Sequence, residues 1–95
     1  MNVVWTAEGH EDAEEILRYL RERNPAASIK LADAFILFSD LLSRMPEIAP
    51  VWQKNPAYRM WSGIYPYKIF YTIDEREQTV FIESVYHGKR KNPDL

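Results

Sequence analysis

The side chains best suited to chemistry in this sequence are cations, a histidine and tyrosines of the C-terminal half. They are Arg59, Tyr65, Tyr67, Lys68, Tyr71, Tyr86, His87, Lys89 and Arg90. Such residues suit metal-free RNA cleavage by the 2′-hydroxyl, which needs a base, an acid and positive charge at the developing phosphorane. A partly solvated sheet face with a basic edge would carry the same residue types. Both interpretations stay open on residue type alone.

The distribution of charge favours the same half of the chain. The net charge of −2 combines five Lys/Arg and nine Asp/Glu in residues 1–50 with seven and five in residues 51–95. The cations cluster at Lys89, Arg90 and Lys91, directly after His87. If the chain binds an anion, we expect it to bind there, and the alternative is a short basic tail that improves solubility.

Several classes of chemistry are excluded by composition. The chain has no cysteine, which excludes disulfides, Cys-ligated zinc and thiol chemistry. Three glycines without a phosphate-loop spacing make a nucleotide cofactor improbable. His10 and Glu14 are spaced for one helix face, but two ligands do not make a metal site. We therefore expect no cofactor and no metal.

Acidic residues gather at the start of the first predicted helix: Glu8, Glu11, Asp12, Glu14 and Glu15. The positive end of the helix dipole and solvation explain them without a catalytic role.

A length of 95 residues predicts a single domain over residues 1–95. No apolar stretch approaches the roughly 20 residues of a membrane span, and the N-terminus lacks an export signal. The sequence therefore favours a cytoplasmic protein with no membrane partner.

The pattern of apolar residues predicts a strand over Asn2–Trp5 and helices over 7–23 and 25–44, separated by Asn24-Pro25. The second helix has a seam of Ala27, Leu31, Ala34, Phe38, Leu41 and Met45. Ile29, Ala32, Ile36 and Leu37 widen this seam, so we expect the helix to lie between the first helix and another layer. Its apolar surplus also indicates where a partner could make apolar contacts.

From Ala57 onward, apolar residues recur at every second position, which is the period of a strand. Strands are expected over 57–61, 67–73 and 79–87, with a turn at Ser62-Gly63, a hairpin loop over 74–78 and at most a short edge strand over 51–54. The predicted class is α+β, in the order β-α-α-β-β-β, with a helical hairpin on a mainly antiparallel sheet of three to four strands.

Strand alternation assigns faces to the candidate residues. Tyr67, Ile69, Tyr71 and Ile73 form the core face, with Lys68 on the opposite face. On the last strand, Val80, Ile82, Ser84 and Tyr86 share one face, and Phe81, Glu83, Val85 and His87 share the other. This alternation allows Arg59, Lys68 and His87 to meet on the sheet face away from the helices.

Short motifs along nearly the whole chain resemble one known superfamily. They are Trp5-Thr6, the acidic helix start with Tyr19, Asn24-Pro25, Met45-Pro46, Arg59, the strand Tyr65-Pro66-Tyr67-Lys68-Ile69-Phe70-Tyr71, and Val85-Tyr86-His87-Gly88-Lys89-Arg90. In this order they resemble the RelE/ParE superfamily of toxins from type II toxin–antitoxin systems, some of which stabilise plasmids. The resemblance implies the same fold and a neighbouring antitoxin, with a disordered segment that folds on the toxin in a possible hetero-oligomer.

The resemblance leaves two targets. RelE-like members cut mRNA on the ribosome with strand-borne cations and often a late tyrosine, which implies catalytic roles for Arg59, Lys68, His87 and Arg90. ParE-like members inhibit DNA gyrase, which implies a binding surface of Arg59, Tyr65, Lys68, His87, Lys89, Arg90 and Lys91. No tyrosine follows Tyr86 and the chain is not basic, so we prefer the ParE-like branch. A third alternative is an inactive member kept for antitoxin binding.

Overall fold

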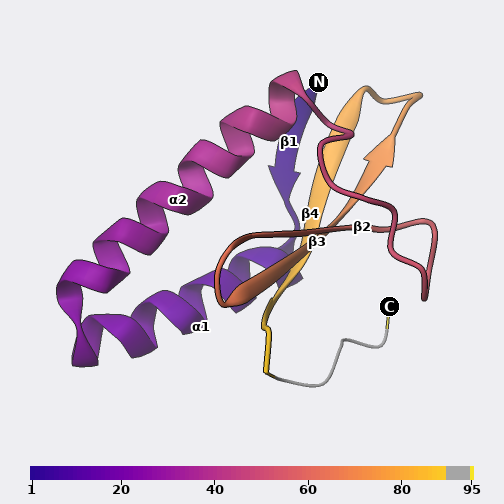
Figure 1. Ribbon diagram of the computed structural model, residues 1–95. Helices are drawn as coiled ribbons and strands as arrows, with labels where there is room; N and C mark the ends of the chain where they lie inside the picture. The colour runs from indigo at the N-terminus through magenta and orange to yellow at the C-terminus, as the bar shows by residue number, and fades with distance from the viewer. Residues whose placement is uncertain (90–94) are drawn as a thin grey trace.

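The computed structural model describes residues 1–89 and residue 95 of the chain. Its elements are β1 (Asn2–Trp5), α1 (Ala7–Arg23), α2 (Pro25–Arg44), β2 (Arg59–Ile64), β3 (Tyr67–Asp74) and β4 (Thr79–His87). Both helices lie on one side of the sheet (Figure 1). The predicted α+β class and element order are confirmed.

Both helices start at the residues that the sequence indicates. The Gly9 backbone N–H donates to Thr6 Oγ1 (3.0 Å), which makes Thr6 the N-cap of α1. The Ala27 N–H donates to Asn24 Oδ1 (3.2 Å), and Pro25 occupies the first turn of α2. Side-chain acceptors at these positions satisfy backbone donors that a helix start leaves unpaired. A single residue, Asn24, thus separates the helices and forces the hairpin.

The sheet has the strand order β1-β4-β3-β2. β1 pairs with β4 in parallel, while β3 is antiparallel to both of its neighbours. The N-terminal strand therefore lies beside the last strand, on the far side of the sheet from β2. None of the helices in the described part is long and apolar enough to cross a membrane.

The core lies between α2 and the sheet. α2 contributes Leu31, Phe35, Phe38 and Leu42, and the sheet contributes Ile69, Tyr71, Val80 and Ile82. The Phe38 ring stacks on Trp61 with 5.3 Å between ring centroids. Burial of these large side chains supplies most of the stabilisation available to a chain of this size.

The exposed side of α2 corrects one expectation. Leu31 and Phe38 are buried as predicted, but the other buried positions are Ser28, Phe35 and Leu42, one residue away from the predicted seam. Ile29, Ile36 and Leu37 are 65%, 66% and 69% exposed, so α2 is not covered by another layer. A helix that is apolar on several sides does not fix its own rotation, and the tertiary contacts decide it.

The region before β3 differs most from the prediction. β2 runs through the expected Ser62-Gly63 turn, with a shift in its register with β3 between Trp61 and Ile64. The Trp61 ring lies against Gly63, where a Cβ would collide with it. The chain turns instead at Tyr65-Pro66, through a cis peptide bond. The expected edge strand is reduced to a single bridge between Val51 and Arg59.

Candidate functional site

A bulge in β4 decides which face of the sheet carries each candidate residue. The pairs between β3 and β4 are Tyr71 with Ile82, Phe70 with Ser84, Ile69 with Val85, Lys68 with Tyr86 and Tyr67 with His87. Glu83 is therefore an extra residue that interrupts the alternation. Val85 and His87 lie on the helix side, and Tyr86 lies on the outer side, which is the reverse of the prediction. Regular alternation cannot anticipate a bulge.

The N-terminal half of α1 holds this bulge in place. The Asp12 carboxylate accepts hydrogen bonds from Ser84 Oγ (3.1 Å) and the Val85 N–H (3.0 Å). Thr6 Oγ1 donates to the Ile82 carbonyl (3.1 Å), and a Cβ on Gly9 would overlap that carbonyl. Asp12 is therefore a structural acceptor, and the prediction that solvation explains it is wrong. Thr6, Gly9 and Asp12 are each three residues apart, which places them on one side of the helix start. This spacing is the sequence signal for a shared contact surface that the sequence analysis missed.

His87 faces α1 across a groove of about 760 Å³. The groove is lined by Asp12, Glu15, Ile16, Tyr19, Leu20, Tyr67, Val85, Tyr86 and His87. The His87 ring meets the Tyr67 ring edge-on at 5.6 Å, and its Nδ1 accepts from the Lys89 N–H (3.1 Å). Burial raises the pKa of the Tyr67 hydroxyl, and Tyr19 adds to the shift, so Tyr67 stays protonated at neutral pH.

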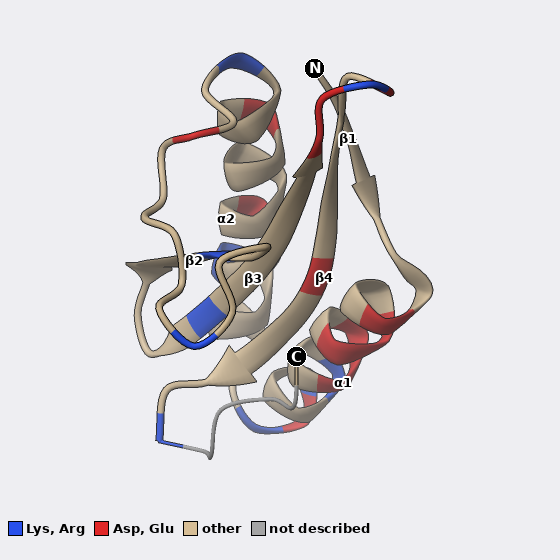
Figure 2. Ribbon diagram, turned by 90° about the vertical axis from the view of Figure 1, so that its right-hand side faces the viewer, with Lys and Arg blue, Asp and Glu red and all other residues tan. Residues whose placement is uncertain are grey.

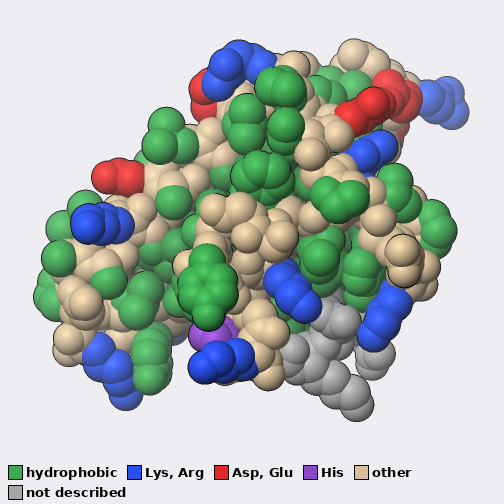
Figure 3. All heavy atoms as spheres, in the orientation of Figure 1, with side chains coloured by type: hydrophobic (Ala, Val, Ile, Leu, Met, Phe, Trp, Pro, Cys, Tyr) green, Lys and Arg blue, Asp and Glu red, His purple; other side chains and the backbone are tan. Residues whose placement is uncertain are grey.

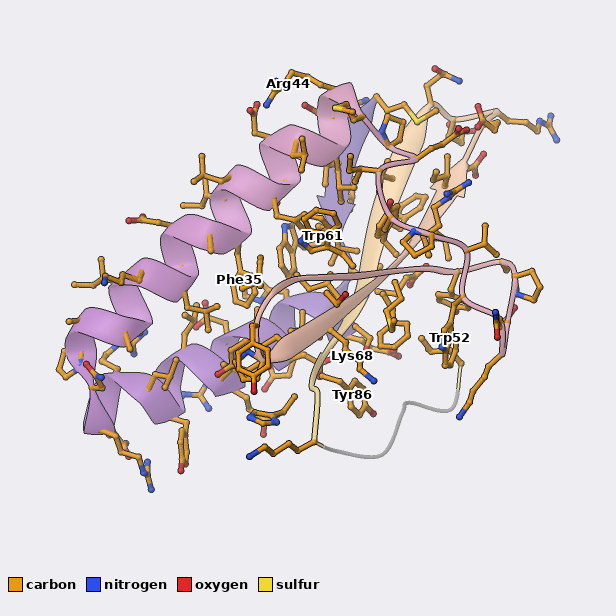
Figure 4. The ribbon with its side chains drawn as sticks, in the orientation of Figure 1. Phe35, Arg44, Trp52, Trp61, Lys68 and Tyr86 are labelled. Atoms are coloured by element: carbon orange, nitrogen blue, oxygen red, sulfur yellow. The ribbon has the colours of Figure 1, made fainter. Side chains whose placement is uncertain are left out.

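Lys68 lies on the opposite, outer face of the sheet. Its cross-strand partner is Tyr86, and Figure 4 shows both side chains on the same side as Trp52. The Trp52 ring packs edge-on against Phe70 at 4.8 Å and buries it. Trp52 comes from the segment between α2 and β2, where no periodic pattern in the sequence predicts its position. This outer surface combines one cation with aromatic rings.

Arg59 lies apart from both groups. It pairs with Tyr71, which places it on the helix side at the edge strand. Its guanidinium donates to the carbonyl of Ala49 (2.7 Å) and, more weakly, to that of Glu47 (3.5 Å). These contacts hold the segment that connects α2 to β2.

Tyr71 also contacts the segment that connects α2 to β2. Its hydroxyl donates to the Pro46 carbonyl (2.7 Å) and accepts from the Ala49 N–H (3.2 Å). Burial raises the pKa of this hydroxyl, while the Ala49 hydrogen bond and the Arg59 charge lower it in part. Because Tyr71 must keep its proton to donate to Pro46, the raised pKa favours the observed contact.

The remaining candidates meet at the end of the sheet where β4 ends. The Gly88 N–H donates to the Pro66 carbonyl (2.6 Å), which ties the β2–β3 turn to the residues after β4. Tyr65 in this turn is 87% exposed, and Lys89, which directly follows Gly88, is also exposed. Arg90 and Lys91 lie outside the described residues. Figure 3 shows basic side chains near a histidine on this part of the surface.

The structure therefore joins some predicted site residues and separates others. Tyr65, His87 and Lys89 come together at one end of the sheet, and Lys68 lies at the same end but on the outer face. Arg59 instead donates to carbonyls of the segment that connects α2 to β2. The proposed meeting of Arg59, Lys68 and His87 on one face is wrong. In the described part of the chain, no three His, Asp or Glu side chains are grouped to hold a metal.

The element order β-α-α-β-β-β agrees with the fold that the resemblance to the RelE/ParE superfamily implies. A family model described as the ParE toxin of the type II toxin–antitoxin system parDE matches residues 3–92. The chain belongs to this family.

The structural comparison agrees in fold. A solved chain described as the chromosomal ParDE TA system from P. aeruginosa superposes with a TM-score of 0.70 at 13% identity, covering 92% of this chain and 95% of the other. Among curated proteins, the sequence search finds no match.

Proposed function

We propose that this toxin inhibits DNA gyrase by binding it, and that a cognate antitoxin neutralises the toxin. The target surface is the end of the sheet that carries Tyr65, Lys68, His87 and Lys89, together with Arg90 and Lys91 beyond the described residues. Family membership supports a toxin, and the gyrase target is our inference from the site.

The separation of the three catalytic candidates that the structure describes, Arg59, Lys68 and His87, is the observation that carries this proposal. A metal-free ribonuclease must place its base, acid and cations around one phosphate. Here Lys68 and His87 lie on opposite faces of the sheet, and Arg59 donates to backbone carbonyls. A binding surface has no such requirement, because a protein partner can contact both faces at the rim of a sheet.

Arg59 has an indirect role in this proposal. It holds the segment that carries Trp52, and Trp52 covers the outer face beside Phe70. We therefore expect Arg59 to position the outer surface rather than to contact gyrase.

Two assays with the purified protein test the target. We expect inhibition of gyrase supercoiling, and no cleavage of mRNA on translating ribosomes at the same concentrations. Cleavage of ribosome-bound mRNA without inhibition of gyrase would instead support the RelE-like alternative. A folded protein that is inactive in both assays would support the third alternative, an inactive family member kept for antitoxin binding.

The toxin proposal also makes a prediction in cells. Gyrase acts on DNA in the cytoplasm, so we place the toxin there, and with its antitoxin it would stabilise a replicon that encodes both. We expect expression of the chain alone to arrest growth, and co-expression of the adjacent gene to restore it. A harmless chain that copurifies with no adjacent gene product would contradict this role.

A further inference from the structure

The groove between α1 and the end of β4 is large enough to receive a side chain of another protein. Its volume of about 760 Å³ lies in the range of about 300 to 1,000 Å³ that is usual for binding pockets. Asp12, Glu15 and Tyr19 line it from α1, and Tyr67 and His87 line it from the sheet. The β4 bulge contributes to this arrangement, because it places His87 on the helix side. The groove therefore combines carboxylates with aromatic rings.

The two carboxylates in the groove can accept a cationic partner. Both hydrogen bonds to Asp12 are on Oδ2, and Oδ1 has no partner among the described residues. The exposed Glu15 carboxylate likewise has no hydrogen bond or ion pair within the described part of the chain. Figure 2 shows acidic residues concentrated on α1, and no described Lys or Arg lines the groove. A cation therefore complements this groove better than an anion does.

The aromatic rings of the groove favour a guanidinium over an ammonium group. Tyr19, Tyr67 and His87 line it, and the Tyr67 and His87 rings meet edge-on at 5.6 Å. The faces of tyrosine rings attract cations, and arginine is the more frequent partner. Arg23 makes this contact within the chain, since its guanidinium carbon lies 3.7 Å from the centroid of the Tyr19 ring. A planar guanidinium can stack on a ring and also pair with a carboxylate in two-pronged geometry, which an ammonium group cannot do.

The chain's own Arg23 does not fill the groove. It is not one of the lining residues, and its guanidinium is held at the last turn of α1. There it donates to the Tyr19 carbonyl (3.3 Å) and lies 3.9 Å from a Glu22 carboxylate oxygen. The Asp12 and Glu15 carboxylates therefore stay open to a cation that comes from another molecule.

We propose that this groove binds an arginine side chain of the target protein, which is gyrase under the proposed function. The guanidinium pairs with the Asp12 and Glu15 carboxylates and stacks on a tyrosine ring of the groove wall. His87 belongs both to the groove and to the proposed target surface, so one partner can contact both. The assignment of the arginine to gyrase rests on the proposed function, whereas the affinity of the groove for a guanidinium does not.

The affinity for a guanidinium is tested by NMR titration of the full chain with Nα-acetylarginine amide. The matched control probe is Nα-acetylcitrulline amide, which has nearly the same shape but no charge. We expect the arginine probe to shift the Val85 and His87 amide signals, and the citrulline probe to leave them nearly unchanged. Glu15→Lys should abolish the shifts, while Glu11→Lys, an equal charge change at an exposed residue outside the groove, should preserve them. Equal shifts with both probes, or equal effects of both variants, would overturn the inference.

Supercoiling assays separate the inference from the function on which it rests. We expect half-inhibition of gyrase to need about tenfold more Glu15→Lys than wild-type chain, and about the wild-type amount of Glu11→Lys. If the wild-type chain and both variants inhibit gyrase equally, the groove assignment is wrong and the proposed function stands. Loss of binding to the adjacent gene product in Glu15→Lys, or a dimer that this variant dissociates in sedimentation, would also overturn the assignment to gyrase. A wild-type chain that does not inhibit gyrase would remove the proposed function, and the titration would still decide whether the groove binds a guanidinium.

Discussion

The two helices of the hairpin are attached to the sheet in different ways. α1 buries Ala13 in the core, but its directional contacts with β4 are polar, with Thr6 and Asp12 bonded to the bulge and Gly9 against the Ile82 backbone. α2 contacts the sheet through large apolar side chains, including Phe38 stacked on Trp61. Hydrogen bonds are directional, while apolar contact is not. We conclude that α1 fixes the register of the bulge and that α2 provides most of the stabilisation.

The largest effect is expected from the apolar attachment. Phe38 is 3% exposed and contacts both Trp61 and Tyr71, so Phe38→Ala should destabilise the protein by about 3 to 5 kcal/mol. Thermal denaturation should show a mostly unfolded variant. Leu37→Ala, on the exposed side of the same helix, should change the free energy of unfolding by less than about 0.5 kcal/mol. A Phe38→Ala protein with the wild-type melting temperature would refute the core assignment.

Gly9→Ala tests how closely α1 approaches β4. Alanine is the better helix former by about 1 kcal/mol, so an unconstrained site would become more stable. Here the new Cβ would overlap the Ile82 carbonyl, and we expect a net loss of about 1 to 3 kcal/mol. The sign of the change in melting temperature decides the matter, because a rise would mean that α1 is free to move from β4.

Asp12→Ala removes the acceptor for the bulge. The Val85 N–H would lose its partner, which should cost about 1 to 3 kcal/mol in chemical denaturation. Asp12→Asn keeps a carbonyl oxygen and should lose less. Glu11→Ala, an exposed acid in the same turn, is the matched control and should have little effect. Equal losses for Asp12→Ala and Glu11→Ala would contradict the polar attachment.

Tyr71→Phe should have the smallest effect, about 1 kcal/mol, through the contacts with Pro46 and Ala49. The folded-state pKa of Tyr71 lies above the unfolded value near 10, so the folded chain holds this proton more tightly. Its contribution is present below about pH 10 and is lost as pH rises through the folded-state pKa. The alkaline decline in stability should be shallower in Tyr71→Phe. An unchanged decline would assign the effect to other groups.

The sequence predicted the helices well because their ends carry local signals, the caps Thr6 and Asn24. It could not predict the β4 bulge, because the bulge depends on Asp12, which is 73 residues from Val85. Tyr65, His87 and Lys89 lie at the end of the sheet where β4 ends, and their role as a binding site stays a prediction. The predicted face of His87 is wrong because the bulge reverses the alternation of β4. The role of Arg59 could not be predicted either, because it depends on carbonyls of an irregular segment that has no periodic pattern.

A double-mutant cycle between Lys68 and His87 tests most directly whether the protein acts by binding. Lys68→Ala, His87→Ala and the double variant are compared in gyrase supercoiling inhibition, with circular dichroism to confirm folding. Because the two side chains lie on opposite faces, we expect partial losses that add to within about 0.5 kcal/mol. Residues that act as one catalytic unit are strongly non-additive. Complete loss of activity in each single variant, with no further loss in the double variant, would contradict the account.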